Sequence, residues 1–300
     1  MKLNIKKLVI WLTVIMVACF ITAGIILAVF GNLGITLEKI DETKTIETEG
    51  VDEISIDITS TDIDIISTDE GEITVHLYGE VSANSKKELP ALIAYKTGKE
   101  LRIEIARPRM VLIGINIWRT KLDVYVPKDL IETLKIDTVS SDTRISDLNV
   151  NKINISTVSG DFKGEALITD SLKLNSTSGD INLGDYTGSV KINTVSGDVV
   201  LENGSQNDNV EAVTVSGDIY MEQKDSSNIN IRTISGDVEI NLSEDARFYI
   251  RADSVSGDIK NKFPIKIISS GRTNLEGVVG GDEKEIIIST TSGDINIDYR

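Results

Sequence analysis

The sequence predicts an all-β fold, a single-stranded β-solenoid whose rungs are about 19 residues long. The first observation is a repeated phrase, in which a small or β-branched residue precedes Ser-Gly-Asp and an apolar residue follows. Successive central positions lie 18 to 21 residues apart up to Gly257, and the last step is 36, which is close to two periods. The first copy of the phrase, Ser140-Ser141-Asp142, is degenerate and lacks the glycine. The glycines of the later copies are Gly160, Gly179, Gly197, Gly217, Gly236, Gly257 and Gly293.

The second observation is strand periodicity between the phrases. Residues 152–156 and 228–232 alternate apolar and polar side chains, as a strand with one buried face does. The alternation slips at each phrase, because the apolar positions before residues 194–198 have one parity and those after them have the other. Each unit is therefore predicted to be two short strands about a corner, and stacked units would enclose an aliphatic core.

The corner residues have predicted structural roles. The seven glycines are expected to adopt positive φ without a Cβ clash, and the aspartate after each is expected to accept hydrogen bonds within its own turn. In register, these carboxylates would form a ladder at strand spacing, so calcium binding is the alternative interpretation. The nine-residue glycine-rich repeat of calcium-loaded β-rolls is absent. The candidate aspartates are Asp161, Asp180, Asp198, Asp218, Asp237, Asp258 and Asp294.

The N-terminus carries an apolar segment. Residues 8–30 are uncharged and long enough to span the hydrocarbon core of a membrane. Lysines precede this segment and acids follow it, so the positive-inside rule predicts residues 1–7 in the cytoplasm and the remainder outside. A cleaved signal peptide and a lipoprotein signal ending at Cys19 are the alternatives, but the length of the segment favours a retained single-pass anchor. Cys19 is the only cysteine, so no disulfide within the chain is expected.

Three further segments follow the anchor. Residues 31–50 are polar and acidic, which is typical of a linker. Residues 51–137 alternate less regularly and are expected to form the N-terminal part and cap of the solenoid, whereas 138–300 form its regular repeats. The doubled step after Gly257 predicts a hairpin excursion that closes the C-terminal end, before residues 285–289 return to the stack.

The Ser-Gly-Asp units, behind one N-terminal apolar segment, resemble the bacterial putative-adhesin, LiaG-like family of β-strand repeat proteins, a domain of unknown function. The resemblance covers residues 45–300. It implies a β-solenoid that faces the cell envelope, and in some members of the family it implies a link to cell-envelope stress operons. It implies no catalytic residues.

The charge restricts the class of partner. The formal net charge is −16, and residues 31–300 carry −19 because the first thirty residues contain three lysines and no acid. Such a field repels nucleic acid and anionic polymers, and it favours basic proteins or divalent cations. We therefore expect no nucleic-acid partner, and instead another envelope protein or a wall component.

Catalytic chemistry is poorly supported by the residues. The motif serines lack an oriented base, since His76 is the only histidine and is expected on a strand surface. A cysteine and histidine cluster of zinc spacing is also absent from the sequence. A carbohydrate-active β-helix enzyme is a remote alternative, because its acids would cluster on one face rather than recur evenly. We expect a protein without catalysis or cofactor.

Two classes of function remain open from the sequence. One is a membrane-anchored, extracytoplasmic module that acts as an adhesin-like interaction surface or scaffold at the cell envelope. The other is an accessory sensor or regulator of an envelope-stress response that acts on a membrane partner. Only the family resemblance favours the second class.

Overall fold

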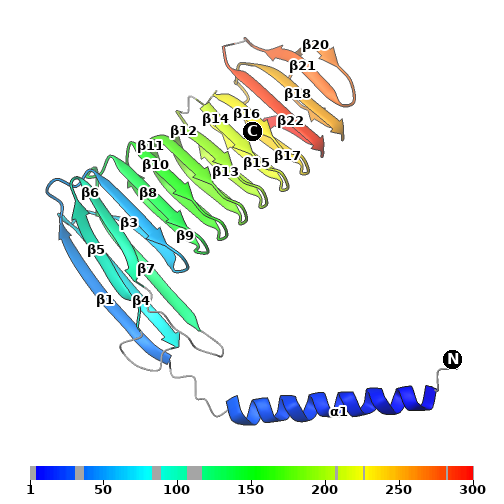
Figure 1. Ribbon diagram of the computed structural model, residues 1–300. Coiled ribbons are helices and arrows are strands. Elements are labelled where there is room, and N and C mark those ends of the chain that lie inside the picture. The colour runs from blue at the N-terminus through cyan, green and yellow to red at the C-terminus, as the bar shows by residue number, and fades with distance from the viewer. Residues whose placement is uncertain are drawn as a thin grey trace.

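The computed structural model describes residues 5–30, 37–82, 89–106, 117–206, 209–225, 227–281 and 283–299. Its strands stack side by side into one elongated array, and helix α1 (Ile5–Phe30) lies apart from that array, as Figure 1 shows. The all-β prediction is confirmed, because every element after α1 is a strand in the described part of the chain. The repeats build the solenoid-like stack that the sequence predicts.

Helix α1 contains the predicted membrane span of residues 8–30. Its side chains are described for residues 11–25, and all of these are exposed. Within the described residues, the structure contains no helix of the length and apolar character that crossing a membrane requires. The structure therefore does not support the transmembrane prediction.

The stack has two faces, here called face A and face B, and each central rung contributes one strand to each. Face A holds, in stacking order, β5 (Ala91–Thr97), β6 (Glu100–Ala106), β2 (Glu53–Ile58), β8 (Thr133–Thr138), β10 (Lys152–Ser156), the second halves of β11 (Phe162–Asn175) and β12 (Ile181–Asn193), β14 (Asn209–Val213), β16 (Asn228–Arg232), β22 (Glu285–Ser292), β18 (Phe248–Ser256), β21 (Asn274–Val279) and β20 (Lys266–Ser270). The strands from β6 to β18 run parallel to one another.

Face B is built in the same way. It holds, in stacking order, β1 (Leu37–Glu47), β4 (Glu72–Ser82), β7 (Trp118–Pro127), β3 (Asp62–Thr68), β9 (Thr143–Asn149), the first halves of β11 and β12, β13 (Val199–Gly204), β15 (Ile219–Gln223), β17 (Val238–Leu242), β23 (Ile295–Tyr299) and β19 (Ile259–Asn261). Only the first strands, β1 and β4, run antiparallel to their neighbours.

The core lies between the two faces and consists of aligned aliphatic columns. On face A, Leu172 pairs with Ile153 on one side and with Val190 on the other, and all three side chains are buried. Each buried aliphatic side chain contributes about 1.5–3 kcal/mol by leaving water. Because a one-residue slip would turn the whole column outward, this pattern fixes the register of the rungs.

Both ends of the stack depart from chain order. Residues 53–68 form the second rung, because β2 and β3 lie between the strands of 100–127 and those of 133–149. At the other end, β22 and β23 lie between the rung of 228–242 and the rung of 248–261. The predicted hairpin excursion is present as β20 and β21, which pair antiparallel and stack outside β18, while residues 285–289 return to the stack inside β18.

The predicted linker over residues 31–50 is also partly wrong. Strand β1, Leu37–Glu47, pairs antiparallel with β4 along its whole length and forms the edge of face B. The sequence conceals this strand because charged residues occupy most of it, and charged side chains are a usual protection for an edge strand. Residues 31–36 lie outside the described residues.

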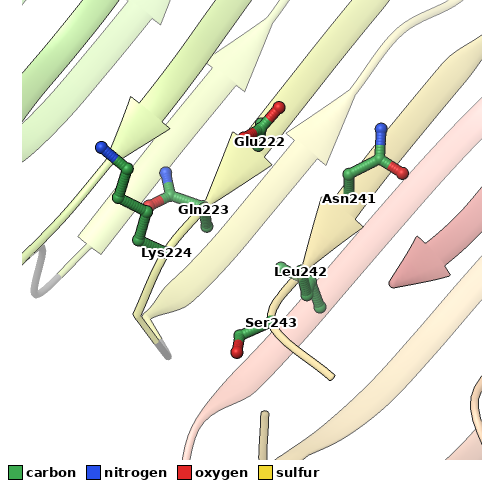
Figure 2. Close-up of a pocket in the computed structure, with 6 residues that line it drawn as sticks. All are labelled: Glu222, Gln223, Lys224, Asn241, Leu242 and Ser243. Carbon is green, nitrogen blue, oxygen red and sulfur yellow. The ribbon is translucent and has the colours of Figure 1, made fainter. Parts of the chain in front are cut away.

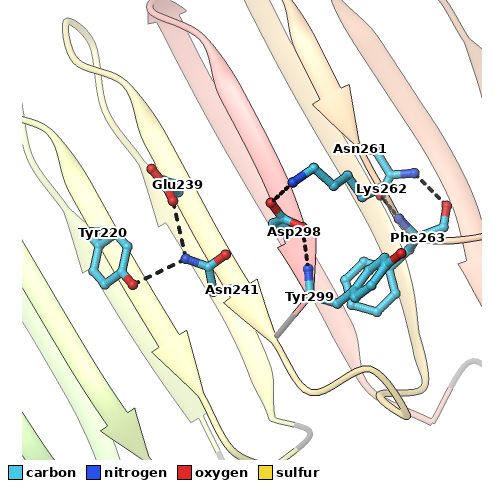
Figure 3. A network of polar contacts seen from close by, with 8 residues as sticks. All are labelled: Tyr220, Glu239, Asn241, Asn261, Lys262, Phe263, Asp298 and Tyr299. Carbon is cyan, nitrogen blue, oxygen red and sulfur yellow. Dashed lines mark hydrogen bonds and ion pairs between the residues drawn. The ribbon is translucent and has the colours of Figure 1, made fainter.

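Aromatic side chains close the C-terminal end of the core. Phe263 makes edge contacts with Phe248 and Tyr299, at centroid distances of 5.1 and 5.3 Å. Beside them, Lys262 forms an ion pair with Asp298, whose Oδ1 accepts the backbone N–H of Tyr299 at 2.8 Å (Figure 3). These contacts hold the last rungs together where the aliphatic columns end.

Candidate functional site: the Ser-Gly-Asp corner

The Ser-Gly-Asp phrases form one continuous corner between face A and face B. Their serines bridge from rung to rung in the order Ser140, Ser159, Ser178, Ser196, Ser216, Ser235, Ser292 and Ser256. The structure thus brings together residues that are far apart in the chain, since Ser235 is followed in the stack by Ser292. The serines of the corner are thus aligned along the stack in every central rung.

The aspartates of these corners form a hydrogen-bonded row, here called the aspartate row. In each step, Oδ1 of one aspartate accepts the backbone N–H of the aspartate in the next rung, at 2.7 to 3.0 Å. This hydrogen bond therefore joins two rungs, whereas the sequence predicted a hydrogen bond within one turn. In-register parallel stacking places the neighbouring N–H within reach of the carboxylate. The row consists of Asp142, Asp161, Asp180, Asp198, Asp218, Asp237, Asp294 and Asp258.

The motif glycines are required mainly because adjacent rungs stack closely, and less because of their backbone φ angles. Gly217 has φ +153°, but Gly236 has no such positive φ, and both face the same obstacle. A Cβ on Gly217 would lie 2.1 Å from the carbonyl oxygen of Gly197, and one on Gly236 would lie 2.0 Å from that of Gly217. The other motif glycines meet the carbonyl of the adjacent rung at similarly short distances. The predicted positive φ is confirmed for Gly160, Gly179, Gly197 and Gly217 and is wrong for Gly236, Gly257 and Gly293.

The residue before each serine points into solvent. Six of these positions are aliphatic and 44% to 76% exposed, and we call them the aliphatic stripe. Thr177 and Thr291, also exposed, occupy the same position in the two remaining rungs. Exposed apolar side chains are ordinary when they are scattered, but here they are aligned in one row, interrupted only at the two threonines, and an aligned row is typical of an interaction surface. The stripe consists of Val139, Val158, Val195, Val215, Ile234 and Val255.

The aspartate row carries unbalanced charge. Within the described residues, Asp258 is its only member with an ion-pair partner, Arg272 at 2.9 Å. Neighbouring members lie in successive rungs, about 4.8 Å apart, where two like charges repel by about 1 kcal/mol in water. In the described part of the chain, no three acidic, histidine or cysteine side chains converge closely enough to hold a metal ion. Calcium binding by these aspartates stays a prediction.

A second corner, on the opposite side of the rungs, was not visible in the sequence. In four successive rungs a residue there adopts a left-handed conformation, namely Asp147, Ala166, Asp185 and Asn203, with φ between 46° and 58°. Two of them are aspartates, one is an alanine and one is an asparagine, so they do not repeat as a single motif. Asn and Asp tolerate this conformation well, but alanine does so at a cost of about 1–2 kcal/mol.

A buried polar pair lies inside the second corner. The side-chain amide of Gln223 donates to the hydroxyl of Tyr186 at 2.6 Å, and both residues are almost fully buried. The two are two rungs apart, with Gly204 between them. A Cβ on Gly204 would lie 2.4 Å from the Gln223 side chain, so the glycine leaves room for the pair. Burial raises the pKa of Tyr186 well above its ordinary value.

A shallow pocket of about 200 Å³ opens beside this pair and is shown in Figure 2. Lys224 at its rim forms an ion pair with Asp185 at 3.2 Å. Asn241 donates to Tyr220 and to Glu239, both at 3.3 Å (Figure 3). These two polar side chains are therefore engaged with residues outside the pocket lining. The lining residues are Glu222, Gln223, Lys224, Asn241, Leu242 and Ser243.

His76 lies on the outer surface of face B, as expected for a strand surface residue. Its Nε2 is 2.9 Å from Oδ1 of Asp41, and its ring stacks on Tyr78. The adjacent strand places Asp123 opposite His76, where burial and the neighbouring Asp64 raise the pKa of the Asp123 carboxyl. None of the motif serines belongs to this cluster, so it does not supply them with a base.

The comparisons with known proteins agree with this architecture. A family model described as Toastrack DUF4097 matches residues 51–298. The chain belongs to the Toastrack DUF4097 family. The match covers both faces of the stack from β2 to β23, so the sequence-based resemblance to a β-repeat family of putative adhesins is confirmed.

Solved structures resemble the Toastrack domain at low sequence identity. A putative adhesin from Bacteroides fragilis NCTC 9343 is 13% identical, covering 87% of this chain and 97% of its own, with a TM-score of 0.52. A putative adhesin from Parabacteroides merdae ATCC 43184 is 12% identical, covering 85% and 95%, with a TM-score of 0.43. The first similarity shows a shared fold. None of the curated proteins matches the chain.

Proposed function

We propose that this chain is a non-enzymatic, adhesin-like interaction module that works at the cell envelope. The observation that carries the proposal is the row of repeated corners, because it presents the same exposed side chains in rung after rung of a rigid stack. Membership of the Toastrack family and structural neighbours called putative adhesins support this reading. A surface of repeated weak contacts suits binding rather than catalysis, which needs unique groups held at one point.

The proposal includes a tether. Residues 8–30 supply an uncharged segment with lysines before it and acids after it, which supports a cytoplasmic N-terminus and an extracytoplasmic stack. This part rests on the sequence alone. The acidic stack would then face basic envelope proteins, or divalent cations associated with wall polymers.

Fractionation and crosslinking of intact cells test the proposal. The full chain is compared with a fragment starting at residue 31, which retains strand β1 and the closure of face B. We expect the full chain in the membrane fraction, accessible to an impermeant crosslinker and joined to an envelope partner. Recovery of both forms from the cytosol would contradict the tether.

The absence of catalysis has its own test. The purified chain is incubated with wall polysaccharide, and the release of new reducing ends is measured against a boiled sample. We expect no release above the boiled sample. Sustained release that increases with protein concentration would identify an enzyme and overturn the proposal.

A further inference from the structure

The aliphatic stripe is not demanded by the backbone of the corner. The carbonyl of Val158 accepts the N–H of Ser178 at 2.9 Å, and the carbonyl of Thr177 accepts that of Ser196 at 3.0 Å. Valine and threonine rungs therefore make the same ladder bond, and threonine is the more soluble choice. The chain nevertheless exposes an aliphatic side chain in six of the eight rungs. The apolar character of the stripe requires an explanation outside the fold.

The aspartate row runs beside the stripe, three residues further along each corner. Asp161, Asp180, Asp198, Asp218 and Asp237 are exposed, and within the described residues none of them has an ion-pair partner. Each keeps one oxygen engaged with the next rung, so the charges are held in line at the rung spacing. The complementary surface is thus apolar along one line and basic along a parallel one.

We propose that the aliphatic stripe and the aspartate row together dock a basic amphipathic helix of a partner protein, with the helix axis along the stack. This inference rests on the proposed function and names the surface and the partner chemistry for it. The apolar face of the helix packs on the stripe, and lysine or arginine side chains on one flank meet the carboxylates.

Spacing favours a helix over an extended strand. Rungs repeat about every 4.8 Å, and a helix brings a side chain to the same face about every 5.4 Å, once per turn. The helix therefore drifts from the rungs by only about 0.6 Å per turn, whereas an extended strand, which returns to the same face about every 6.7 Å, drifts by about 1.9 Å per two residues. Eight rungs span about 34 Å, which corresponds to about 22 helical residues.

Charge argues against two other occupants. A second copy of this chain would bring its own aspartate row against the first, and like charges at such a contact oppose association. An anionic lipid surface would be repelled for the same reason. A basic helix instead relieves the repulsion along the row, so it gains both from apolar burial and from charge.

The test uses the purified full chain in a non-ionic detergent and a fluorescently labelled 22-residue peptide as the probe. The peptide has leucines on one helical face and lysines on both flanks, and empty micelles of the same detergent give the background. Fluorescence anisotropy measures the affinity at several salt concentrations. Two further peptides serve as comparators, one with glutamate in place of lysine and one with the leucine and lysine order scrambled.

Two variants remove one property each while keeping the corner intact. The stripe variant is Val195→Thr, Val215→Thr and Ile234→Thr, since threonine already occupies this position at Thr177 and Thr291. The row variant is Asp180→Asn, Asp198→Asn and Asp218→Asn, because the amide oxygen can still accept the ladder hydrogen bond. Matched controls lie away from the corner on exposed positions: Ile168→Thr with Ile267→Thr and Ile268→Thr, and Glu132→Gln with Asp170→Asn and Glu202→Gln.

We expect the stripe variant to bind the Leu/Lys peptide at least about tenfold more weakly than the wild type. The row variant should also bind more weakly and should lose most of the salt dependence. The two controls should stay within about twofold of the wild type, and the comparator peptides should not bind above background. Equal weakening by the controls, tight binding of the scrambled peptide, or wild-type affinity in the stripe variant would each overturn the docking surface.

The outcome is separable from that of the proposed function. Peptide binding is measured on purified protein, so it does not depend on where the chain resides in the cell. If the stripe variant binds like the wild type while cells still show the chain crosslinked at the envelope, the corner is the wrong docking surface. The proposal that the chain is an envelope interaction module then still stands. If binding behaves as expected but the chain is cytosolic, the proposed localisation fails alone.

Discussion

Individual residues in the corner act on the neighbouring rung rather than on their own turn. Gly236 must lack a Cβ because the carbonyl of Gly217 occupies that space, and Asp198 uses its carboxylate to hold the N–H of Asp218. Sequence reasoning identified these residue types but attributed them to local turn chemistry. A close approach between rungs cannot be inferred from a single unit, because it exists only after two units stack.

Gly236→Ala separates the stacking requirement from backbone strain. Gly236 is free of left-handed φ, yet its Cβ would meet a backbone oxygen at 2.0 Å, so we expect a loss of about 2–3 kcal/mol in the free energy of unfolding. Gly98→Ala is the matched control, because Gly98 has φ +64° and open space around it, and about 1 kcal/mol is expected there. Chemical denaturation measures both variants. A larger loss at Gly98 would make φ the dominant cause.

Asp198 gives a second prediction at this scale. Asp198→Asn preserves the acceptor for the Asp218 N–H and removes one of the repelling charges, so the free energy of unfolding should change by less than about 0.5 kcal/mol. Asp198→Ala removes the acceptor and should cost about 1 kcal/mol. Both are measured by urea denaturation at low and high salt. If the asparagine variant is the less stable of the two, the carboxylate charge itself matters, and the calcium interpretation gains support.

At the scale of elements, the two corners differ in how far the sequence reveals them. The Ser-Gly-Asp corner repeats its residues because a steric contact recurs in every rung. The second corner requires only a residue in the left-handed conformation. Residues as different as Asp147, Ala166 and Asn203 adopt it, so no sequence motif marks this corner. Strand β1 was missed for a related reason, since its charged residues give no apolar alternation and its identity as a strand comes from pairing with β4.

The buried Tyr186 and Gln223 pair predicts an alkaline sensitivity. Because burial raises the pKa of Tyr186, the phenol is neutral when folded but ionises near pH 10 when unfolded, at about the ordinary tyrosine pKa. Its contribution to stability is therefore complete below about pH 10 and is lost as the pH rises toward the folded pKa. Tyr186→Phe removes both the hydrogen bond and the titration.

The measurement is the difference in unfolding free energy between the wild type and Tyr186→Phe at about pH 8 and at about pH 11. We expect the wild type to be more stable by about 1–2 kcal/mol at the lower pH, and we expect this advantage to shrink at the higher pH. Lysine and arginine ion pairs are common to both proteins and cancel in the comparison. An advantage that is constant or grows with pH would contradict the assignment.

For the whole molecule, the order of rungs is the feature that the sequence least specifies. Every central unit has the same corner and the same aliphatic columns, so each rung can in principle stack on any other. The sequence therefore supports the period and the fold class but not the position of 285–299 between 228–242 and 248–261. The position of residues 285–299 is determined only when all the rungs have stacked.

A chain that ends after Gly281 tests the importance of the inserted rung. It lacks β22 and β23, which pair on both sides, so β18 and β19 lose their connection to the rest of the stack. We expect the midpoint of thermal unfolding to fall by at least about 10 °C. Replacing residues 266–270 by a Gly/Ser segment is the control, because β20 is exposed throughout and pairs on one side only. A truncated chain that unfolds at the wild-type temperature would show that the inserted rung is dispensable.

The inserted end rungs also determine where such a chain can grow by duplication of its units. Between residues 133 and 242, chain order and stacking order coincide, so an extra unit copied into this interval adds one rung and lengthens the stack by about 4.8 Å. A unit added beyond residue 242 would instead have to separate β16 from β22, or β22 from β18. Length can therefore vary only in the interior, while both ends keep their closures.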